Sequence, residues 1–391
     1  MASPFLNGNE ITLLESGGEF FPALCAALDA ARYEIHLESY IFTRDATGIK
    51  VADALIAAVR RGVKTRVIVD GFGGRDFAHD TMPELIDAGV EVLLYNRDFA
   101  GLGSTRQRLR RMHRKLTVVD RSVAFVGGIN IIDDMHTPKQ IPPRFDYAVA
   151  IRGPLVGPAW ESASELWERL CWTNFKRPPS WVVLPVPPPG PVGRQRAALV
   201  LRDNFRHRAD IEDAYLRALR RARKEAIIAN AYFLPGRRFR AALIDAAKRG
   251  VRVTLLLQGH MEYWLLRHGC RALYPHLLSN GVRIVEYRKS FLHAKVAVMD
   301  DNWATVGSSN IDPFSLLVAR EANVIVRDEA FTAQLRHSLE RAMEIGGVEL
   351  DASQWRRRPF GQRLVSWVAL TLVRLLVGMS GYARTARARE E

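Results

Sequence analysis

The stretch His113-Arg-Lys115-Leu-Thr-Val-Val-Asp120, followed by Gly127-Gly128-Ile-Asn130, has a second copy, His293-Ala-Lys295-Val-Ala-Val-Met-Asp300 followed by Gly307-Ser308-Ser-Asn310. All spacings are the same in the two copies. In a chain of this composition, His-x-Lys-x-x-x-x-Asp is expected by chance on the order of 0.01 times. Two copies therefore indicate an internal duplication, and the fold has to be predicted from that repeat.

The segments around each motif also repeat in the same order. Residues 31–42 and 222–233 are matching β-rich runs, and each is followed by a helix-length amphipathic segment and an apolar strand, at 65–71 and 253–259. Later strands are expected at 91–95, 116–119, 123–126 and 147–151, with counterparts at 283–287, 296–299, 304–306 and 323–326. This alternation is typical of an α/β fold in which helices cover a largely buried sheet.

The repeat also predicts the domain organisation. We expect two similar α/β sandwich domains, at residues 1–175 and 199–350. A proline-rich linker at 176–198 would join them, since its prolines neither donate to a sheet nor continue a helix. A basic, amphipathic segment follows at 351–391.

Composition narrows the class of protein. The 391 residues are 48% hydrophobic and 25% charged, which excludes a largely disordered chain and a multi-span membrane protein. The 56 Lys and Arg against 42 Asp and Glu give a net charge of +14, which favours nucleic acid or an anionic membrane surface as partner. Cys25, Cys171 and Cys270 are odd in number and widely spaced, so they predict neither a disulfide framework nor a zinc site.

The motif residues suit phosphodiester chemistry. Side chains two apart on a strand share a face, so each motif presents its imidazole and its ammonium group to the same ligand. Lysine then stabilises the non-bridging oxygens, while histidine attacks phosphorus or protonates the leaving oxygen. The glycines permit close backbone approach, and Asn130 and Asn310 can donate amide hydrogens to the phosphoryl group. Asp120 and Asp300 end their strands at turns, which favours a structural role over proton transfer.

These residues resemble the phospholipase D superfamily, whose signature is this duplicated motif followed by Gly-(Gly/Ser)-x-Asn. The resemblance spans roughly residues 9–328. The run Glu38-Ser-Tyr40 and the stretch 110–120 are similar, more narrowly, to bacterial cardiolipin synthases of the B type. The resemblance implies mixed sheets flanked by helices, two halves related by a pseudo-twofold axis, and one active site between them. It also implies that no cofactor and no metal is required.

The same resemblance implies roles for individual residues. His113 is expected to form a phosphohistidine and His293 to act as acid and then base, although the symmetry of the motifs leaves the reverse order open. The remaining members of the expected site are Lys115, Lys295, Asp120, Asp300, Asn130, Asn310, Gly128 and Ser308. The family also places a carboxylate after each motif to orient a histidine, and Asp146 and Glu321 occupy those positions. The alternative for both is a surface carboxylate that opens an edge strand.

Other polar residues carry weaker indications. Asp133, Asp134 and His136 could form a metal cluster, but no further ligand spacing supports one. Glu38 and Tyr40 could line the site or simply end a strand. The basic run at 106–115 leads directly into the first motif, which favours an anionic headgroup site over a solvated charged face.

The C-terminal stretch 364–379 is the most hydrophobic in the chain, but Arg374 interrupts it and it is short for a membrane span of about 20 residues. With basic residues on both sides, it predicts an interfacial helix in an anionic leaflet. A core helix docked on the catalytic body is the alternative. The N-terminus lacks a basic and an apolar signal region, so the body is expected in the cytoplasm, at the inner face of the cell membrane.

Together with the C-terminal stretch, the resemblance implies a membrane-peripheral phosphatidyltransferase that makes cardiolipin from phosphatidylglycerol and a second phospholipid. A hydrolase of the same superfamily, either a phospholipase or a nuclease, is the first alternative. A nuclease would explain the charge but leaves the terminal hydrophobic segment unused, so nucleic acid is not the expected partner. A catalytically inactive membrane scaffold is the second alternative, which two intact motifs disfavour. The sequence indicates no oligomeric state.

Overall fold

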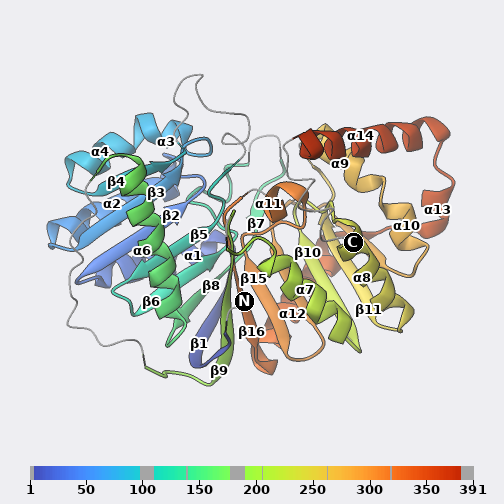
Figure 1. Cartoon of the computed structure of the whole chain (residues 1–391), viewed down its shortest axis with the longest axis horizontal. Coiled ribbons are helices and arrows are strands. Elements are labelled where there is room, and N and C mark those ends of the chain that lie inside the picture. Colours follow the sequence, from blue (N-terminus) through green and yellow to red (C-terminus); the bar gives the residue numbers. More distant parts are fainter. Residues whose placement is uncertain are drawn as a thin grey trace.

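The computed structural model describes residues 4–96, 110–137, 140–176, 190–204, 206–261, 263–317 and 319–379. In these ranges the chain forms two similar α/β halves that lie side by side (Figure 1). The elements of the first half are β1 (Leu6–Glu15), α1 (Ser16–Ala30), β2 (Glu34–Ser39), α2 (Ala46–Arg60), β3 (Lys64–Asp70), α3 (Arg75–Asp80), α4 (Met82–Asp87), β4 (Glu91–Tyr95), β5 (Lys115–Val119), β6 (Val123–Gly127), β7 (Arg144–Phe145), β8 (Tyr147–Arg152) and α6 (Val156–Thr173).

The second half repeats this order and adds elements at its end. Its elements are β9 (Gln195–Arg202), α7 (Asp210–Arg221), β10 (Glu225–Asn230), α8 (Arg237–Lys248), β11 (Arg252–Gln258), α9 (Trp264–Arg271), α10 (Tyr274–Leu278), β12 (Arg283–Tyr287), β13 (Phe291–Leu292), β14 (Lys295–Met299), β15 (Trp303–Gly307), α11 (Pro313–Leu317), β16 (Glu321–Arg327), α12 (Glu329–Gly346), β17 (Gly347–Glu349), α13 (Ala352–Arg356) and α14 (Phe360–Met379).

The two halves share one sheet, in the order β17-β12-β11-β10-β14-β15-β16-β9-β1-β8-β6-β5-β2-β3-β4. In each half three strands are parallel, β2 to β4 and β10 to β12, and the motif strands β5 and β14 pair antiparallel with β2 and β10. The α/β fold with a mixed sheet is therefore confirmed. The halves join where β1 and β9 pair antiparallel, with Leu6 opposite Ala197 and Asn9 opposite Gln195.

These two joining strands differ from the sequence prediction. β1 was not predicted because the turn-forming residues Asn7-Gly8-Asn9 interrupt its apolar alternation. β9 begins at Gln195, inside the predicted linker, because its apolar residues pair with β16 and β1 rather than remaining in a connector. Of the predicted linker, residues 177–189 lie outside the described residues. Within the β-rich run at 31–42 the strand itself covers only Glu34–Ser39.

Helices cover both faces of the sheet (Figure 1). In the first half α1 and α2 pack on one face, and α6 covers the other. In the second half α7 and α8 correspond to α1 and α2, while α12 corresponds to α6. One apolar core continues across the junction, with Leu13 and Val149 from the first half packed in the same cluster as Leu199 and Val324 from the second. This shared core fixes the two motif strands relative to one another.

The C-terminal helix α14 lies along α9 at one end of the molecule (Figure 1). One face of α14 is buried, through Ala369, Leu370 and Val373, and Leu370 and Val373 belong to the core of the second half. The helix therefore docks on the body, which was the alternative expectation, and still presents exposed apolar side chains outward. Among the described residues no helix combines the length and the apolarity that crossing a bilayer requires. Residues 380–391 lie outside the described part.

Candidate active site

Each motif histidine is held by the backbone of the opposite half. The N–H of His113 donates to the carbonyl of Arg320 at 2.9 Å, and the N–H of Arg320 donates to the carbonyl of Arg111 at 2.8 Å. The second copy repeats the pattern, since the N–H of His293 donates to the carbonyl of Phe145 at 2.7 Å and β13 pairs with β7. This exchange of backbone hydrogen bonds places both motifs at the junction of the halves.

The carboxylates that follow the motifs contact the histidines crosswise. Nδ1 of His113 lies 3.0 Å and 3.1 Å from the two carboxylate oxygens of Glu321, which opens β16 of the second half. Nδ1 of His293 lies 2.6 Å from Oδ2 of Asp146, just before β8 of the first half. Both carboxylates are buried. Each half therefore supplies a histidine to the carboxylate of the other, and the Nε2 atoms stay available for chemistry.

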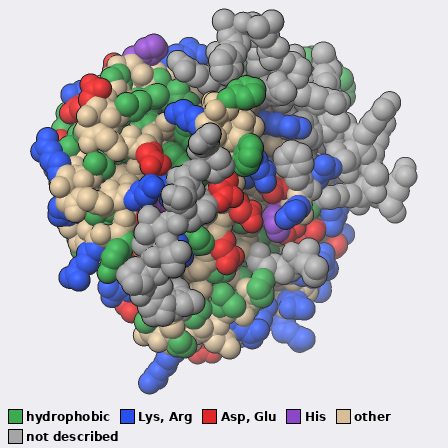
Figure 2. Space-filling model, turned by 60° about the vertical axis from the view of Figure 1, so that its left-hand side comes forward, with side chains coloured by type: hydrophobic (Ala, Val, Ile, Leu, Met, Phe, Trp, Pro, Cys, Tyr) green, Lys and Arg blue, Asp and Glu red, His purple; other side chains and the backbone are tan. Residues whose placement is uncertain are grey.

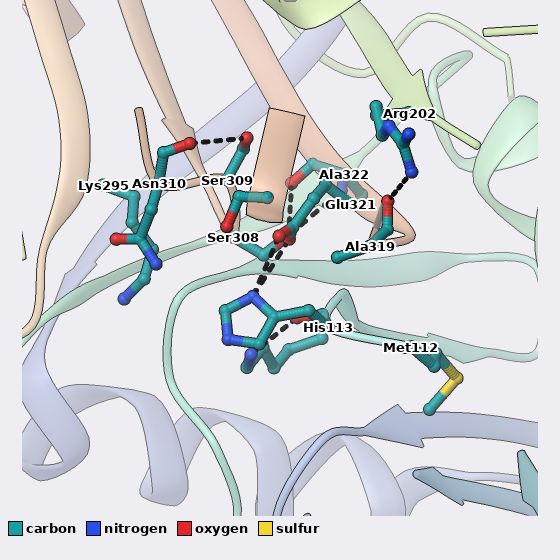
Figure 3. A network of polar contacts seen from close by, with 12 residues as sticks. Met112, His113, Arg202, Lys295, Ser308, Ser309, Asn310, Ala319, Glu321 and Ala322 are labelled. Atoms are coloured by element: carbon teal, nitrogen blue, oxygen red, sulfur yellow. Dashed lines mark hydrogen bonds and ion pairs between the residues drawn. The ribbon is translucent and has the colours of Figure 1, made fainter. Parts of the chain in front are cut away.

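The two lysines complete a compact charged cluster. Nζ of Lys115 donates to the carbonyl of His113 at 2.6 Å and lies 5.4 Å from the ring centre of Tyr40. Nζ of Lys295 lies 3.2 Å from Oδ2 of Asp146 and also donates to the carbonyl of His293. In Figure 3 the imidazole of His113 lies among Ser308, Asn310, Glu321 and Lys295, all from the second half.

Burial is the main cause of the pKa shifts in this cluster. Burial and the neighbouring charge of Lys295 lower the pKa of Lys115 to about 7, against the opposing effect of Glu321 and Asp146. Burial and Lys295 lower the pKa of His293 to about 3, and the pKa of His113 is also lowered, chiefly by burial. Burial would raise the pKa of Asp146, but Lys295 and His293 outweigh it and hold that pKa below its usual value. These shifts favour the ionised form of Asp146 and the neutral forms of His113 and His293.

The small motif residues Gly128 and Ser308 contact the two carboxylates and fix their positions. A Cβ on Gly128 would stand 2.4 Å from Oδ1 of Asp146, so the carboxylate occupies the space that a side chain would fill. At the matching position in the second half, Oγ of Ser308 donates to Oε2 of the longer Glu321 at 2.5 Å. The close approach expected at Gly128 is therefore to Asp146.

The two motif asparagines lie close to the site and differ in their contacts. Oδ1 of Asn130 accepts from the N–H of Ile41 at 3.1 Å, which leaves its amide hydrogens to donate. Oδ1 of Asn310 is buried and accepts no hydrogen bond from the described residues. Both side chains are buried next to the motif that precedes them.

Asp120 and Asp300 are not brought to the histidines. Each follows the far end of its motif strand, β5 or β14, with a backbone φ of +50°. The Asp120 carboxylate accepts from the N–H groups of Arg32, Tyr33 and Glu34 at 2.8 to 2.9 Å. Asp300 accepts in the same way from residues 223–225. This geometry is that of a residue that holds a turn to the start of the neighbouring strand.

The remaining polar candidates from the sequence differ in whether they lie at the site. The Tyr40 ring packs edge-on against His113, with 5.0 Å between ring centres, whereas Glu38 forms a buried ion pair with Arg114 instead of lining the site. Asp133 accepts from Thr47 and Asp134 from the backbone of Gly17. No group of three or more potential metal ligands was found within the described ranges. Of the basic run, residues 106–109 lie outside those ranges.

One supporting residue was missed by the sequence analysis. Asp70, at the end of β3, is buried and accepts from the N–H of Met112 at 2.8 Å, which fixes the backbone just before His113. Burial raises its pKa against the hydrogen bonds from Met112, Phe72 and Gly73. A signal was present, because a carboxylate between a buried strand and Gly71 is typical of a functional strand end.

The chain is similar in sequence to several known proteins. The family model described as "Cardiolipin synthase, PLD-like domain" matches residues 24–139 and 215–343. The chain is 38% identical to cardiolipin synthase B of Escherichia coli K12, over 98% of this chain and 92% of that protein. It is 39% identical to cardiolipin synthase B of Salmonella typhimurium LT2, over 96% and 90%, and 29% identical to cardiolipin synthase of Geobacillus kaustophilus, over 95% and 74%.

A solved structure shares the architecture. The crystal structure of phosphatidylserine synthase from Haemophilus influenzae aligns with a TM-score of 0.68 over 96% of both chains, at 12% sequence identity. At this identity the match supports the fold alone.

Proposed function

The chain belongs to the cardiolipin synthase family with phospholipase D-like domains, and from this premise we propose that it transfers a phosphatidyl group from phosphatidylglycerol to the glycerol hydroxyl of a second phospholipid. The observation that carries the proposal is the crossed pairing of His113 with Glu321 and of His293 with Asp146. Two oriented imidazoles and two lysines at one junction suit a double displacement at phosphorus.

In the first step Nε2 of His113 attacks phosphorus, and the bond from phosphorus to the glycerol oxygen breaks. Glu321 accepts a hydrogen bond from the N–H at Nδ1, which leaves the Nε2 lone pair free to attack. The carboxylate also stabilises the positive charge of the ring that forms. The leaving glycerol oxygen takes a proton from Nε2 of His293. Lys115 and Lys295 stabilise the charge on the non-bridging oxygens.

His293 has to become protonated when the substrate binds, because it acts as the acid in the first step. The pKa of His293 is about 3, because burial and Lys295 disfavour its charged form. A bound phosphodiester brings one negative charge into the same cluster, which favours the protonated forms of His293 and of Lys115. Substrate binding therefore prepares the acid.

In the second step the hydroxyl of the acceptor lipid loses its proton to His293 and attacks the phosphohistidine. The bond from phosphorus to nitrogen breaks and His113 is restored. Water competes at about 55 M, so transfer prevails only if the acceptor is held in line, for which effective molarities of about 10^5 to 10^8 M are attainable. Cardiolipin and free glycerol are the products.

Association with the membrane is the second part of the proposal. The outward face of α14 exposes Phe360, Leu364, Trp367 and Leu375, a combination of aromatic and aliphatic side chains that suits the boundary of headgroups and acyl chains. We expect peripheral binding at the cytoplasmic face of the cell membrane, in contact with anionic phospholipids.

The test is the product spectrum of the full chain with labelled phosphatidylglycerol in vesicles as the only lipid. Cardiolipin and glycerol in equal amounts support the proposal, whereas phosphatidic acid as main product indicates a phospholipase. In a parallel assay with nucleic acid, cleavage without lipid turnover would indicate the nuclease, and no turnover of either substrate would indicate the scaffold.

The matched control is His113→Ala, which should lose roughly 10^4-fold or more in rate. Acid quenching should trap phosphate on His113, and phosphate on His293 instead would reverse the two roles.

A further inference from the structure

A second charged cavity lies outside the active site, between α9, β17, α13 and the residues that directly follow β11 and β12. It has a volume of about 580 Å³ and is lined by four arginines, which we call the arginine pocket: Arg267, Arg271, Arg288 and Arg358. None of the histidines, lysines or carboxylates of the active site lines it. The pocket is therefore a separate candidate for binding an anion.

The acidic residues near the pocket offset only part of this charge. Glu286 is buried and is shared by Arg271, at 3.0 Å, and Arg288, at 2.6 Å. Glu349 and Asp351 also line the cavity, but Glu349 is paired with Arg283 at 2.8 Å. Against the three carboxylates of Glu286, Glu349 and Asp351, the four arginines keep an excess of positive charge.

Arg267 and Arg358 contribute to that excess. The buried Nε of Arg267 donates to no acceptor among the described residues. The guanidinium of Arg358 lies 3.5 Å from the ring centre of Trp355, which is a cation–π contact and not an ion pair. Burial lowers the pKa of both guanidinium groups, and the charge of Arg271 lowers each further. These arginines repel one another, and a bound anion would relieve the repulsion.

The pocket adjoins an exposed apolar surface. Trp264, Arg267 and Arg271 lie at positions i, i+3 and i+7 of α9 and so share one helix face, and the Trp264 ring is 58% exposed. Arg358 lies two residues before Phe360, the first residue of α14, which is 76% exposed. Along α14 the exposed face continues through Trp367 at 63%. Arginines beside exposed aromatic rings are the composition of a surface at the headgroup level of a bilayer.

We propose that the arginine pocket binds the headgroup phosphate of an anionic phospholipid in the membrane, as a lipid site distinct from the active site. The exposed side chains of α9 and α14 would then enter the acyl boundary beside that headgroup. The inference rests on the proposed membrane substrate, since only a protein that works at a bilayer has use for such a site. The arginine pocket would thus add a specific contact with a lipid headgroup to the hydrophobic contact that α9 and α14 make with the acyl chains.

The test measures binding of the full chain to phosphatidylcholine vesicles with and without phosphatidylglycerol. All proteins carry His113→Ala, so that no lipid is turned over. Arg267→Gln with Arg358→Gln should weaken partitioning to phosphatidylglycerol vesicles roughly tenfold or more, and should leave the weak binding to neutral vesicles unchanged. The matched control is Arg60→Gln with Arg220→Gln, which removes the same charge from exposed positions on α2 and α7.

Two outcomes of this binding test would contradict a phospholipid site in the arginine pocket. Equal weakening in the control pair would show that only net charge matters, and displacement from vesicles by an equal concentration of inorganic phosphate would identify a free anion as the ligand. Either outcome overturns the proposal. If the double variant is unstable, Arg358→Gln alone tests the same contact, and Arg267→Lys with Arg358→Lys should restore much of the binding. Because His113→Ala removes the chemistry, these results are independent of whether the wild-type chain forms cardiolipin.

Discussion

Nδ1 of His113, in the first half, lies 3.0 Å from Oε1 of Glu321, the first residue of β16 in the second half. The inverse pair, His293 with Asp146, is made in the opposite direction at 2.6 Å. Neither half thus holds a complete histidine–carboxylate pair of its own. We therefore expect the junction of β1 with β9, and the shared core beneath it, to be required for activity as well as for stability.

Removing the charge of Glu321 should reduce catalysis without unfolding the protein. Glu321→Gln keeps the shape but leaves an amide that favours the wrong tautomer of His113, so kcat should fall by roughly 10^2 to 10^4. Glu329→Gln, an exposed glutamate in the first turn of α12, is the matched control and should leave kcat unchanged. Combined with His113→Ala, the Glu321 variant should cost almost nothing more. A fully additive loss would contradict a pair that acts as a unit.

Gly128 offers a test of how closely the carboxylate is seated. Gly128→Ala places a Cβ 2.4 to 2.5 Å from both oxygens of Asp146, so the carboxylate has to move away from His293. We expect kcat to fall by about 10- to 100-fold, since a displacement of about 1 Å at a positioning residue costs about that much. Gly157→Ala in α6 is the control, because its Cβ would meet open space. Full activity of Gly128→Ala would show that the position of Asp146 is not critical.

The sequence predicted the repeat and the motif strands well, because both depend on local patterns. The spacing of His113 and Lys115 and the apolar runs of β4 and β12 are legible in a single segment. The crossed pairing of His113 with Glu321 is not, since it depends on two segments more than 200 residues apart in the chain. The same holds for β1 and β9, whose pairing joins the halves although neither has a strong strand pattern. For α14 the hydrophobic pattern was clear, but which face docks on α9 is set by tertiary packing.

Asp120 should matter for stability more than for catalysis. Its carboxylate accepts three backbone N–H groups at the start of β2, and removing it in Asp120→Ala leaves them without that acceptor, at a cost of about 1–3 kcal/mol. Asp120→Asn should cost less, because an amide oxygen still accepts and asparagine tolerates the positive φ. Urea denaturation measures both, alongside the activity of the folded enzyme. A loss of kcat as large as that of His113→Ala, with unchanged stability, would contradict this role.

Lys115 should make both activity and stability depend on pH around neutrality. Its pKa is about 7 in the folded enzyme and about 10.5 in an unfolded chain, so between these values the unfolded state binds more protons. The contribution of this group to the free energy of unfolding therefore rises with pH from about 7 to about 10.5. Lys115→Met removes the cost of the buried amine, so this variant should have the higher Tm near pH 7, with the difference from wild type shrinking as the pH approaches 10.

The deprotonation of Lys115 should also appear in the kinetics. It stabilises the fold, but it should lower the activity. The charged ammonium group of Lys115 is the form that attracts a phosphodiester. Because Lys115 loses this charge as the pH rises through about 7, kcat/KM should fall over the same range. Lys115→Arg keeps the charge and should move that fall to higher pH, at some loss of maximal rate because the guanidinium has a different shape. Lys248→Met, at an exposed lysine of α8, is the control and should change neither the pH profile nor the pH dependence of Tm. If the profile of Lys115→Arg instead coincides with that of wild type, another group sets the alkaline limb, and Lys295, whose pKa is also lowered by burial, is the next to test.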